Sequence, residues 1–293
     1  MAIKEKEAGC LDEFWEIISP IGEFITSIDA PVFRGQANSI WNLTPSVLRR
    51  NIFEKYNKNR IKSHTDQIIL FEFLILKDFL YYLDNAGIIV PGDSAEFRKE
   101  FDFYKVADSF GIDGENWPPE EFFPLIALAQ HHGMPTRLLD WSKNSIVAAY
   151  FAASQFLNES TAVDDNSKLA VWVLDLSDLR FFHDSLQVVK LPGSTSNNLA
   201  AQKGLFIIHR KKYGVGRNDE FLPEDICSDV DDLIINSNEC NVHKVTLPTK
   251  FAGDLLLRCE KFGISAATLF PGVDGAVKAA LEYKLAKNLS GIL

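Results

Sequence analysis

The chain has 293 residues, 46% of them hydrophobic, and a formal net charge of −10. This composition suffices for a large packed core and argues against an intrinsically disordered protein. The acidic balance disfavours a general nucleic-acid coat protein, because non-specific binding to phosphates needs a basic face. It does not exclude a local basic patch.

Targeting and metal signals are weak. The N-terminus MAIKEKEAGCLDEF lacks an apolar signal core, and the most hydrophobic window, 68–76, is too short to span a membrane. Four cysteines lie scattered without the dense spacing of a disulfide framework. We therefore expect a reduced, cytoplasmic protein without a membrane segment. Zinc ligands would be available at Cys227, Cys240, His243 and Cys259, but without a Cys-x-x-Cys pair we expect no metal.

The first part of the chain is predicted to be mostly helical. Helical periodicity covers 11–27, and PVFRGQ at 31–36 predicts a short strand that ends at a glycine turn. Residues 39–50 indicate a loop that leads into a short helix, and 64–84 carry the strongest helical pattern. Residues 85–120 are mixed, because Pro-Gly and Pro-Pro breakers interrupt them.

The middle of the chain predicts a helix, a turn, a strand and a second helix. The first helix runs over about 120–131 and ends at a Gly-Met-Pro turn, since proline cannot donate to a continuing helix. TRLLDW at 136–141 is typical of a short strand. Ser142 or Asn144 can then cap a helix that continues through an alanine-rich apolar run.

The last part of the chain supplies most of the predicted strands, followed by helices. Strands are expected at 169–176, 185–192, 204–210 and 243–248, before a helix to about 261 and a C-terminal helix. Because helices come mostly early and strands late, we predict an α+β fold rather than regular βαβ alternation. We expect one domain over 1–293, with a helical insert at about 51–127 and an acidic loop at about 211–240.

Three motifs resemble the FRG domain, a bacterial family named for its Phe-Arg-Gly motif. They are FRGQ with W-x-L-x-P-S-x-x-R at 33–49, QHHGMPTRLLDWS with an alanine-rich helix at 130–152, and AQKGLF at 201–206. FGISAATLFPGVDG at 262–275 resembles the usual C-terminal end of these domains. The resemblance covers roughly residues 12–285. It implies a bacterial defence or toxin context, in which an antitoxin or inhibitor would restrain the protein.

The order of these motifs is also similar, more loosely, to ADP-ribosyltransferases of the Arg/Ser/Glu type. In those enzymes the Arg and the Ser strand hold NAD, and a later Glu stabilises the oxocarbenium-like state as nicotinamide leaves. The resemblance implies an ADP-ribosyltransferase-like central β-sheet with a helical layer. Gln202 stands where that Glu is expected and carries no charge, and Asn198 stands where the FRG family tends to carry Arg. Asp140 or the remote Glu260 would then supply the carboxylate, or the chemistry differs.

The residue types in the motifs predict a nucleotide site. Arg34 offers a planar fork for diphosphate oxygens, although it could simply pair with Asp140, and Gly35 would let the backbone approach a ligand. His132 is a candidate acid–base group, and Trp141 is either core or a stacking wall for nicotinamide or adenine. Catalytic roles are predicted for Arg34, His132, Asp140 and Gln202, and NAD-binding roles for Arg34, Gly35, Gln36, Thr136, Arg137, Trp141 and Ser142.

A basic strip, RRNIFEKYNKNRIK at 49–62, follows the first motif. It holds six basic residues, one acidic residue and two aromatic residues, Phe53 and Tyr56. The strip is either a solvated helix face or a surface on which nucleic-acid bases stack. We assign acceptor binding to Arg49, Arg50, Lys55 and Lys58.

These features favour an NAD-dependent ADP-ribosyltransferase, or an NAD-cleaving relative, acting as a toxin or antiviral effector. Its acceptor would be a single-stranded nucleic acid or a protein. The alternative is a non-catalytic module that binds a nucleotide or nucleic acid. A metal-dependent nuclease is disfavoured, because the motifs lack the clustered carboxylates that hold Mg²⁺.

Overall fold

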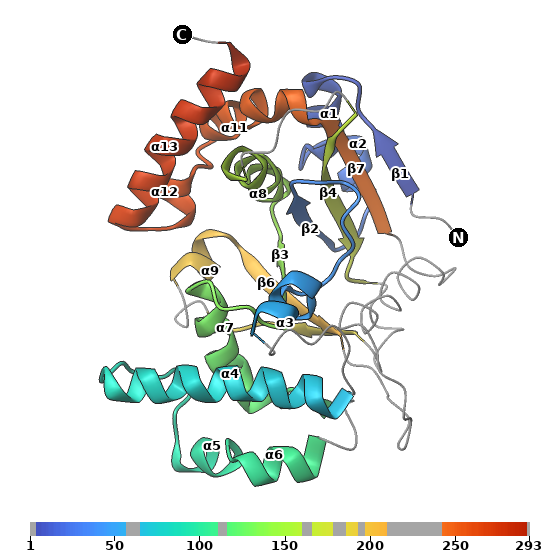
Figure 1. Cartoon of the computed structure of the whole chain (residues 1–293). Helices are drawn as coiled ribbons and strands as arrows, with labels where there is room; N and C mark the ends of the chain where they lie inside the picture. The colour runs from blue at the N-terminus through green and yellow to red at the C-terminus, as the bar shows by residue number, and fades with distance from the viewer. Residues whose placement is uncertain are drawn as a thin grey trace.

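A seven-stranded sheet lies at the centre of the molecule, with the strand order β1-β7-β4-β2-β3-β6-β5 (Figure 1). The computed structural model describes residues 4–56, 65–110, 116–159, 166–177, 186–192, 197–209 and 242–291. Neighbouring strands are antiparallel, except for the parallel pair β1 and β7. The strands are β1 Lys4–Glu7, β2 Pro31–Gln36, β3 Leu139–Ser142, β4 Lys168–Asp175, β5 Leu186–Val189, β6 Gly204–His209 and β7 Val242–Pro248.

The mixed α+β class predicted from the sequence is confirmed, and the strand at 31–36 has the predicted bounds. Strand β1, with the sequence KEKE, was not predicted. All four of its residues are exposed at the edge of the sheet, so the strand lacks the alternation of apolar and polar residues that marks a half-buried strand. Only its backbone pairing with β7 makes it a strand.

Apart from α8 and the short helices α3 and α9, the α-helices form an N-terminal pair, a helical layer and a C-terminal group (Figure 1). The periodicity over 11–27 forms two helices instead of one, because Pro20 falls between them and cannot continue a helix. The helices are α1 Leu11–Ile18, α2 Glu23–Thr26, η1 Ser46–Leu48, α3 Arg50–Tyr56, α4 Thr65–Asn85, α5 Ala95–Glu100, α6 Phe103–Phe110, η3 Glu120–Phe122, α7 Phe123–His131, α8 Ser145–Asn158, α9 Asn197–Ala201, η6 Thr249–Phe251, α11 Ala252–Lys261, α12 Ala266–Leu269 and α13 Val273–Ser290.

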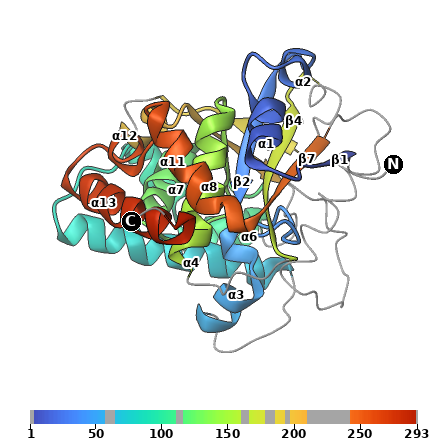
Figure 2. The same cartoon turned by 90° about the horizontal axis from the view of Figure 1, so that it is seen from above.

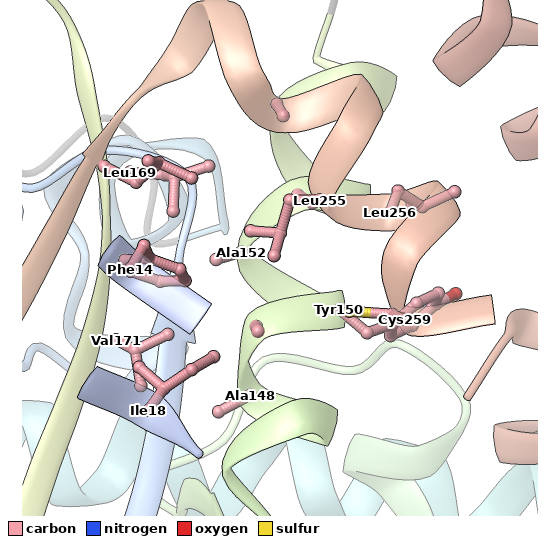
Figure 3. Packing of buried hydrophobic residues seen from close by; sticks show 14 of the residues in the cluster. Phe14, Ile18, Ala148, Tyr150, Ala152, Leu169, Val171, Leu255, Leu256 and Cys259 are labelled. Atoms are coloured by element: carbon pink, nitrogen blue, oxygen red, sulfur yellow. The ribbon is translucent and has the colours of Figure 1, made fainter. Parts of the chain in front are cut away.

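Helix α8 packs directly on β2, and α11 covers its other side (Figure 2). Asn144 caps the helix, since its side-chain oxygen accepts a hydrogen bond from the Ile146 N–H at 3.0 Å. Alanines on α8 meet side chains of α1, β4 and α11 in the main core (Figure 3). The small side chains of this helix therefore allow it to pack closely on the sheet.

Gly35 makes the close approach of α8 to the sheet possible. A Cβ atom at this position would lie 1.9 Å from the Ala148 carbonyl oxygen and 2.7 Å from the Ala152 nitrogen, both of them backbone atoms of α8. The sequence analysis assigned the missing side chain of this glycine to the approach of a ligand, and that role stays a prediction. The space beside its Cα is occupied by a helix.

The helical layer, α4 to α7, packs against the β6–β5 end of the sheet. Helix α4 is buried on two sides: Ile68 and Phe71 join the core under β2 and β3, whereas Ile69 and Phe73 join the core of the layer itself. The helices of the layer fall between residues 65 and 131, and the insert at about 51–127 stays a prediction. Along the described ranges, no helix combines the length and the apolar character that crossing a bilayer requires.

A buried ion pair ties this layer to the segment before β3. Glu72 of α4 accepts hydrogen bonds from Arg137, with Nη2–Oε1 at 2.5 Å and Nε–Oε2 at 3.0 Å. The indole N–H of Trp117 donates to the same carboxylate at 3.1 Å. The two charged side chains are only 3% and 6% exposed. Arg137 was predicted to bind NAD, but in the structure its guanidinium pairs with Glu72 of the helical layer.

Replacement of Arg137 by Ala should destabilise the fold by about 3–5 kcal/mol, because it leaves the Glu72 carboxylate buried without its cation. Chemical denaturation of both proteins measures the loss. Arg98→Ala is the matched control, since Arg98 pairs with Asp84 and Asp93 at the surface and its loss should cost far less. Equal losses in the two variants would contradict a structural role specific to Arg137.

Gly35→Ala should also lower stability, by about 1–3 kcal/mol or more, because the added methyl group collides with the α8 backbone and forces it off the sheet. Thermal denaturation measures the effect. Gly9→Ala is the control, because a Cβ there meets only the Glu13 carboxylate at 3.6 Å. A Gly35→Ala protein as stable as the control would show that α8 can move away without cost.

Candidate functional site

Strands β2 and β3 separate almost as soon as they meet. They share a single paired position, Phe33 opposite Ser142, whereas β2 pairs with β4 along its whole length. A pocket of about 540 Å³ opens where the two strands diverge. Helices α7, α8, α9 and α13 contribute residues to its lining.

The pocket is lined by aromatic side chains, polar groups and charges of both signs. Its floor comes from β2, β3 and β6, and the loop between α12 and α13 supplies Phe270. The lining residues are Phe33, Arg34, Gly35, Ala127, Gln130, His131, Asp140, Trp141, Ser142, Ala148, Phe151, Ser154, Gln155, Asn158, Glu159, Asn198, Leu199, Gln202, Phe206, Phe270 and Lys278.

Arg34 lies in the gap between the two strands. Its Nη1 donates to the backbone oxygen of Asp140 at 2.8 Å and lies 3.9 Å from the carboxylate Oδ2. Its buried Nε has no hydrogen-bond partner among the described residues. Burial lowers the pKa of Arg34 to about 10, so the guanidinium is still charged at neutral pH. The Arg34 side chain therefore bridges the two strands and still has an N–H group that can donate a hydrogen bond at the pocket.

Asp140 presents its carboxylate to the pocket, with 64% of the side chain exposed. Gln130 Nε2 donates to its Oδ1 at 2.6 Å. Enclosure by the surrounding protein raises the pKa of Asp140, while Arg34 and the Gln130 hydrogen bond act against this rise. Glu260, the other carboxylate considered from the sequence, is exposed and does not line this pocket.

Gln130 was not predicted from the sequence, although it begins the second motif. Its Oε1 accepts a short hydrogen bond from the Thr136 hydroxyl. Thr136 itself is buried outside the pocket, where its N–H donates to Ser46 Oγ at 2.9 Å. Thr136 was expected to contact NAD, but it contacts the residue that holds Asp140. One feature of the sequence could have identified Gln130: it is a polar side chain at a helix end, ten residues before Asp140.

The structure selects His131, not His132, for the pocket wall. Asn198 Nδ2 lies 3.1 Å from His131 Nε2, and burial lowers the pKa of His131. His132 is the exposed C-cap of α7 and touches His131 edge-on, with ring centroids 4.9 Å apart. Adjacent helical residues point about 100° apart, so only one of the two can face the pocket. The predicted catalytic place of His132 is corrected accordingly.

Ser142 and Gln202 fasten β3 to the C-terminal part of the chain. The Ser142 hydroxyl donates to the Gln202 backbone oxygen at 2.8 Å and accepts from the Asn144 N–H at 3.0 Å. Gln202 Nε2 donates to the Leu269 carbonyl at 3.2 Å. Both residues line the pocket, as expected, and both also hold its wall together.

Two predicted NAD contacts are mainly structural. Trp141 borders the pocket, but it is 3% exposed and belongs to the core on the other face of the sheet. Gln36 is 3% exposed and lies outside the lining. Its Oε1 accepts from the Trp172 indole at 2.7 Å, and its Nε2 donates to the Asn42 carbonyl at 3.1 Å. Gln36 therefore braces β2 against β4.

In the described part of the predicted acceptor strip, residues 49–56, the basic side chains differ in exposure and in partners. Arg49 is half-buried, and its Nε donates to the Thr44 carbonyl at 3.3 Å. Burial lowers the pKa of Arg49, and the negative charges of Glu159 and Asp140 oppose this shift. Arg50 pairs with Glu54 at 2.8 Å, and Lys55 lies over the exposed Tyr56 ring. Phe53 is fully buried against Phe71, so its predicted stacking on bases is wrong. Lys58 lies outside the described residues.

The zinc ligands considered from the sequence are not assembled in the described part of the chain. Cys227 and Cys240 lie outside it. Among the residues that are described, no three His, Cys, Asp or Glu side chains are grouped to hold a metal. Cys259 is buried on α11, where its Sγ lies 3.8 Å from the Ile146 carbonyl oxygen.

Comparison with known proteins identifies one segment. Residues 29–161 match the family model of the FRG domain. No curated protein and no solved structure gives a significant match to the chain. The matched segment contains Arg34, Gln130 and Asp140, whereas Gln202, Phe270 and Lys278 lie beyond its end. The chain is therefore similar to the FRG domain family over residues 29–161.

Proposed function

We propose that the pocket binds NAD and that the protein transfers ADP-ribose from it to an acceptor, or releases it to water. The main support for this proposal is that the Arg34 guanidinium and the Asp140 carboxylate lie close together in one pocket. The volume of about 540 Å³ and the aromatic lining are typical of sites for nucleotide-sized ligands. Arg34 contacts the diphosphate, and Asp140 faces the nicotinamide ribose.

The proposed reaction breaks the bond between the ribose anomeric carbon and nicotinamide. Nicotinamide leaves as a neutral molecule with the bonding electron pair, and positive charge develops on the ribose ring. Asp140 stabilises this charge electrostatically, a role that the neutral amide of Gln202 cannot fill. An acceptor nucleophile then bonds to the anomeric carbon and gives up its proton to solvent or to Asp140.

The proposed acceptor is a single-stranded nucleic acid or a protein. Arg50 and Lys55 are exposed and suit such a contact, whereas the electrostatic influence of Asp140 and Glu159 on Arg49 suits a role at the pocket. Consumption of NAD fits a toxin or antiviral effector, which would require an inhibitor or antitoxin in its own cell. These assignments extend the resemblance found in the sequence motifs.

A second candidate function is nucleotide binding without turnover. It is favoured by Gln202, which has no charge and whose amide nitrogen donates to the Leu269 carbonyl. A binding module needs the Arg34 contact but does not need an ionised Asp140. Measurements of NAD binding and of nicotinamide release on the same sample separate the two functions.

Arg34→Lys should weaken NAD binding roughly tenfold or more, because lysine keeps the charge but loses the bidentate fork. Titration calorimetry with NAD measures the dissociation constant, and chromatography of released nicotinamide measures turnover. Arg258→Lys is the control, since Arg258 pairs with Asp12 away from the pocket. Unchanged NAD affinity in Arg34→Lys would contradict the proposed diphosphate contact, and binding without nicotinamide release would favour the non-catalytic module.

Asp140→Asn should reduce kcat/KM for nicotinamide release about a hundredfold or more, because the charge that stabilises the ribose cation is removed. In the unmodified protein kcat/KM should fall as the pH is lowered and Asp140 is protonated. Because enclosure raises the pKa of Asp140, this fall should come at a higher pH than for an ordinary aspartate. The fall should be absent in Asp140→Asn and unchanged in Glu260→Gln. The opposite pattern would assign the carboxylate role to Glu260.

A further inference from the structure

A short relay of hydrogen bonds runs from the backbone before β3 into the pocket. The Leu138 N–H donates to Thr136 Oγ1 at 3.2 Å, and the Thr136 hydroxyl is in short contact with Gln130 Oε1. Gln130 Nε2 in turn lies 2.6 Å from Asp140 Oδ1. The amide of Gln130 therefore separates a buried hydroxyl from the carboxylate of the proposed site.

The donors in this relay determine which way the Gln130 amide points. A backbone N–H can only donate, so Thr136 Oγ1 accepts from Leu138 and its own proton is available for Gln130 Oε1. The amide nitrogen then faces Asp140 and donates to it. An ionised carboxylate only accepts hydrogen bonds, and this arrangement satisfies it.

The reversed amide has a different consequence. Gln130 Oε1 would then lie against Asp140 Oδ1, and two acceptor oxygens at that distance are compatible only if the aspartate carries a proton. Gln130 Nε2 would donate to Thr136 Oγ1, and the Thr136 proton would lose its acceptor. A buried hydroxyl proton without an acceptor is unfavourable, so Thr136 opposes both the reversed amide and the protonated Asp140.

We propose that Gln130 is a positioning residue which, with the hydroxyl of Thr136, keeps the Asp140 carboxylate ionised and turned into the pocket. The proposal rests on the function proposed above, because it assigns Gln130 to the carboxylate that acts on the ribose. It also explains why three polar residues of the second motif, at positions 130, 136 and 140, occur together.

Other charged groups act on Asp140 from the surrounding elements, and the test must separate the relay from them. Arg34 and Arg49 favour the ionised form, and enclosure by the surrounding protein disfavours it. Three further titratable groups line the same pocket: His131 at the end of α7, Glu159 directly after α8, and Lys278 of α13. None of these groups is altered by substitutions at Thr136 or Gln130, so a change in Asp140 titration in such variants reports on the relay.

The experiment compares Thr136→Val, which removes the hydroxyl at nearly constant volume, with Thr136→Ser, which retains it. Gln130→Leu removes the amide, and Gln130→Glu places a second carboxylate beside Asp140. Two readouts are taken on each protein: the pH dependence of kcat/KM for nicotinamide release, and the carboxyl carbon NMR titration of Asp140, assigned with Asp140→Asn. Gln187→Leu is the control, because Gln187 donates to Glu120 at 2.5 Å outside the pocket.

In Thr136→Val, Gln130→Leu and Gln130→Glu, the Asp140 titration and the acid side of the rate profile should both move to higher pH. Thr136→Ser and Gln187→Leu should behave like the unmodified protein. Misplacement of the carboxylate should also lower kcat in Gln130→Leu by roughly tenfold to a hundredfold.

The proposal is overturned if Gln130→Leu leaves the titration unchanged, or if Thr136→Ser shifts it as much as Thr136→Val does. Melting curves identify a variant that does not fold. Gln130→Glu at a partly exposed position then decides the question, because an unchanged Asp140 titration beside a second carboxylate would also overturn the proposal. If the unmodified protein binds NAD without releasing nicotinamide, the proposed catalysis fails, while the NMR titration still tests the relay on its own.

Discussion

The site depends on the way in which two central strands part. Because β2 and β3 pair at Phe33 and Ser142 alone, the sheet has a gap in its middle. Arg34 fills it and bridges to the Asp140 backbone. A buried guanidinium carries a desolvation cost, visible in its lowered pKa, and the nearby Asp140 carboxylate offsets part of that cost. The same pair that holds the strands together therefore also places opposite charges in the pocket.

The segment from Gln130 to Ser142 contacts the helical layer with some side chains and the pocket with others. Arg137 points into the helical layer and pairs with Glu72, whereas Asp140 and Ser142 face the pocket. Thr136 ties the segment to two neighbours, because its N–H donates to Ser46 of η1 and its hydroxyl donates to Gln130 of α7. Such a segment is anchored at both faces, and this rigidity is what a site needs if the carboxylate is to keep one orientation.

The pocket extends beyond the segment that matches the FRG domain model. Asn198, Gln202 and Phe206 close one wall, and Phe270 and Lys278 close another. Lys278 Nζ lies 4.4 Å above the Phe270 ring and 3.7 Å from the buried carboxylate of Glu282. Glu282 also accepts from Tyr150 at 2.8 Å, so the C-terminal helix is tied to α8 behind the pocket wall. The C-terminal helices thus contribute both the stability and the lining of the site.

The sequence by itself determined the α+β class, most helices and strands, and the motifs that meet at the pocket, because these follow from local periodicity and from polar residues set in apolar surroundings. It also identified Arg34, Asp140, Ser142 and Gln202, all of which line the pocket. Only the tertiary structure decided between His131 and His132, revealed Gln130, and showed that Gly35 serves α8 and that Arg137 serves Glu72. The physical reason is that a side chain's role depends on its partner. Glu72 and Ala148 are distant in sequence from the residues they contact, so no local pattern records those contacts.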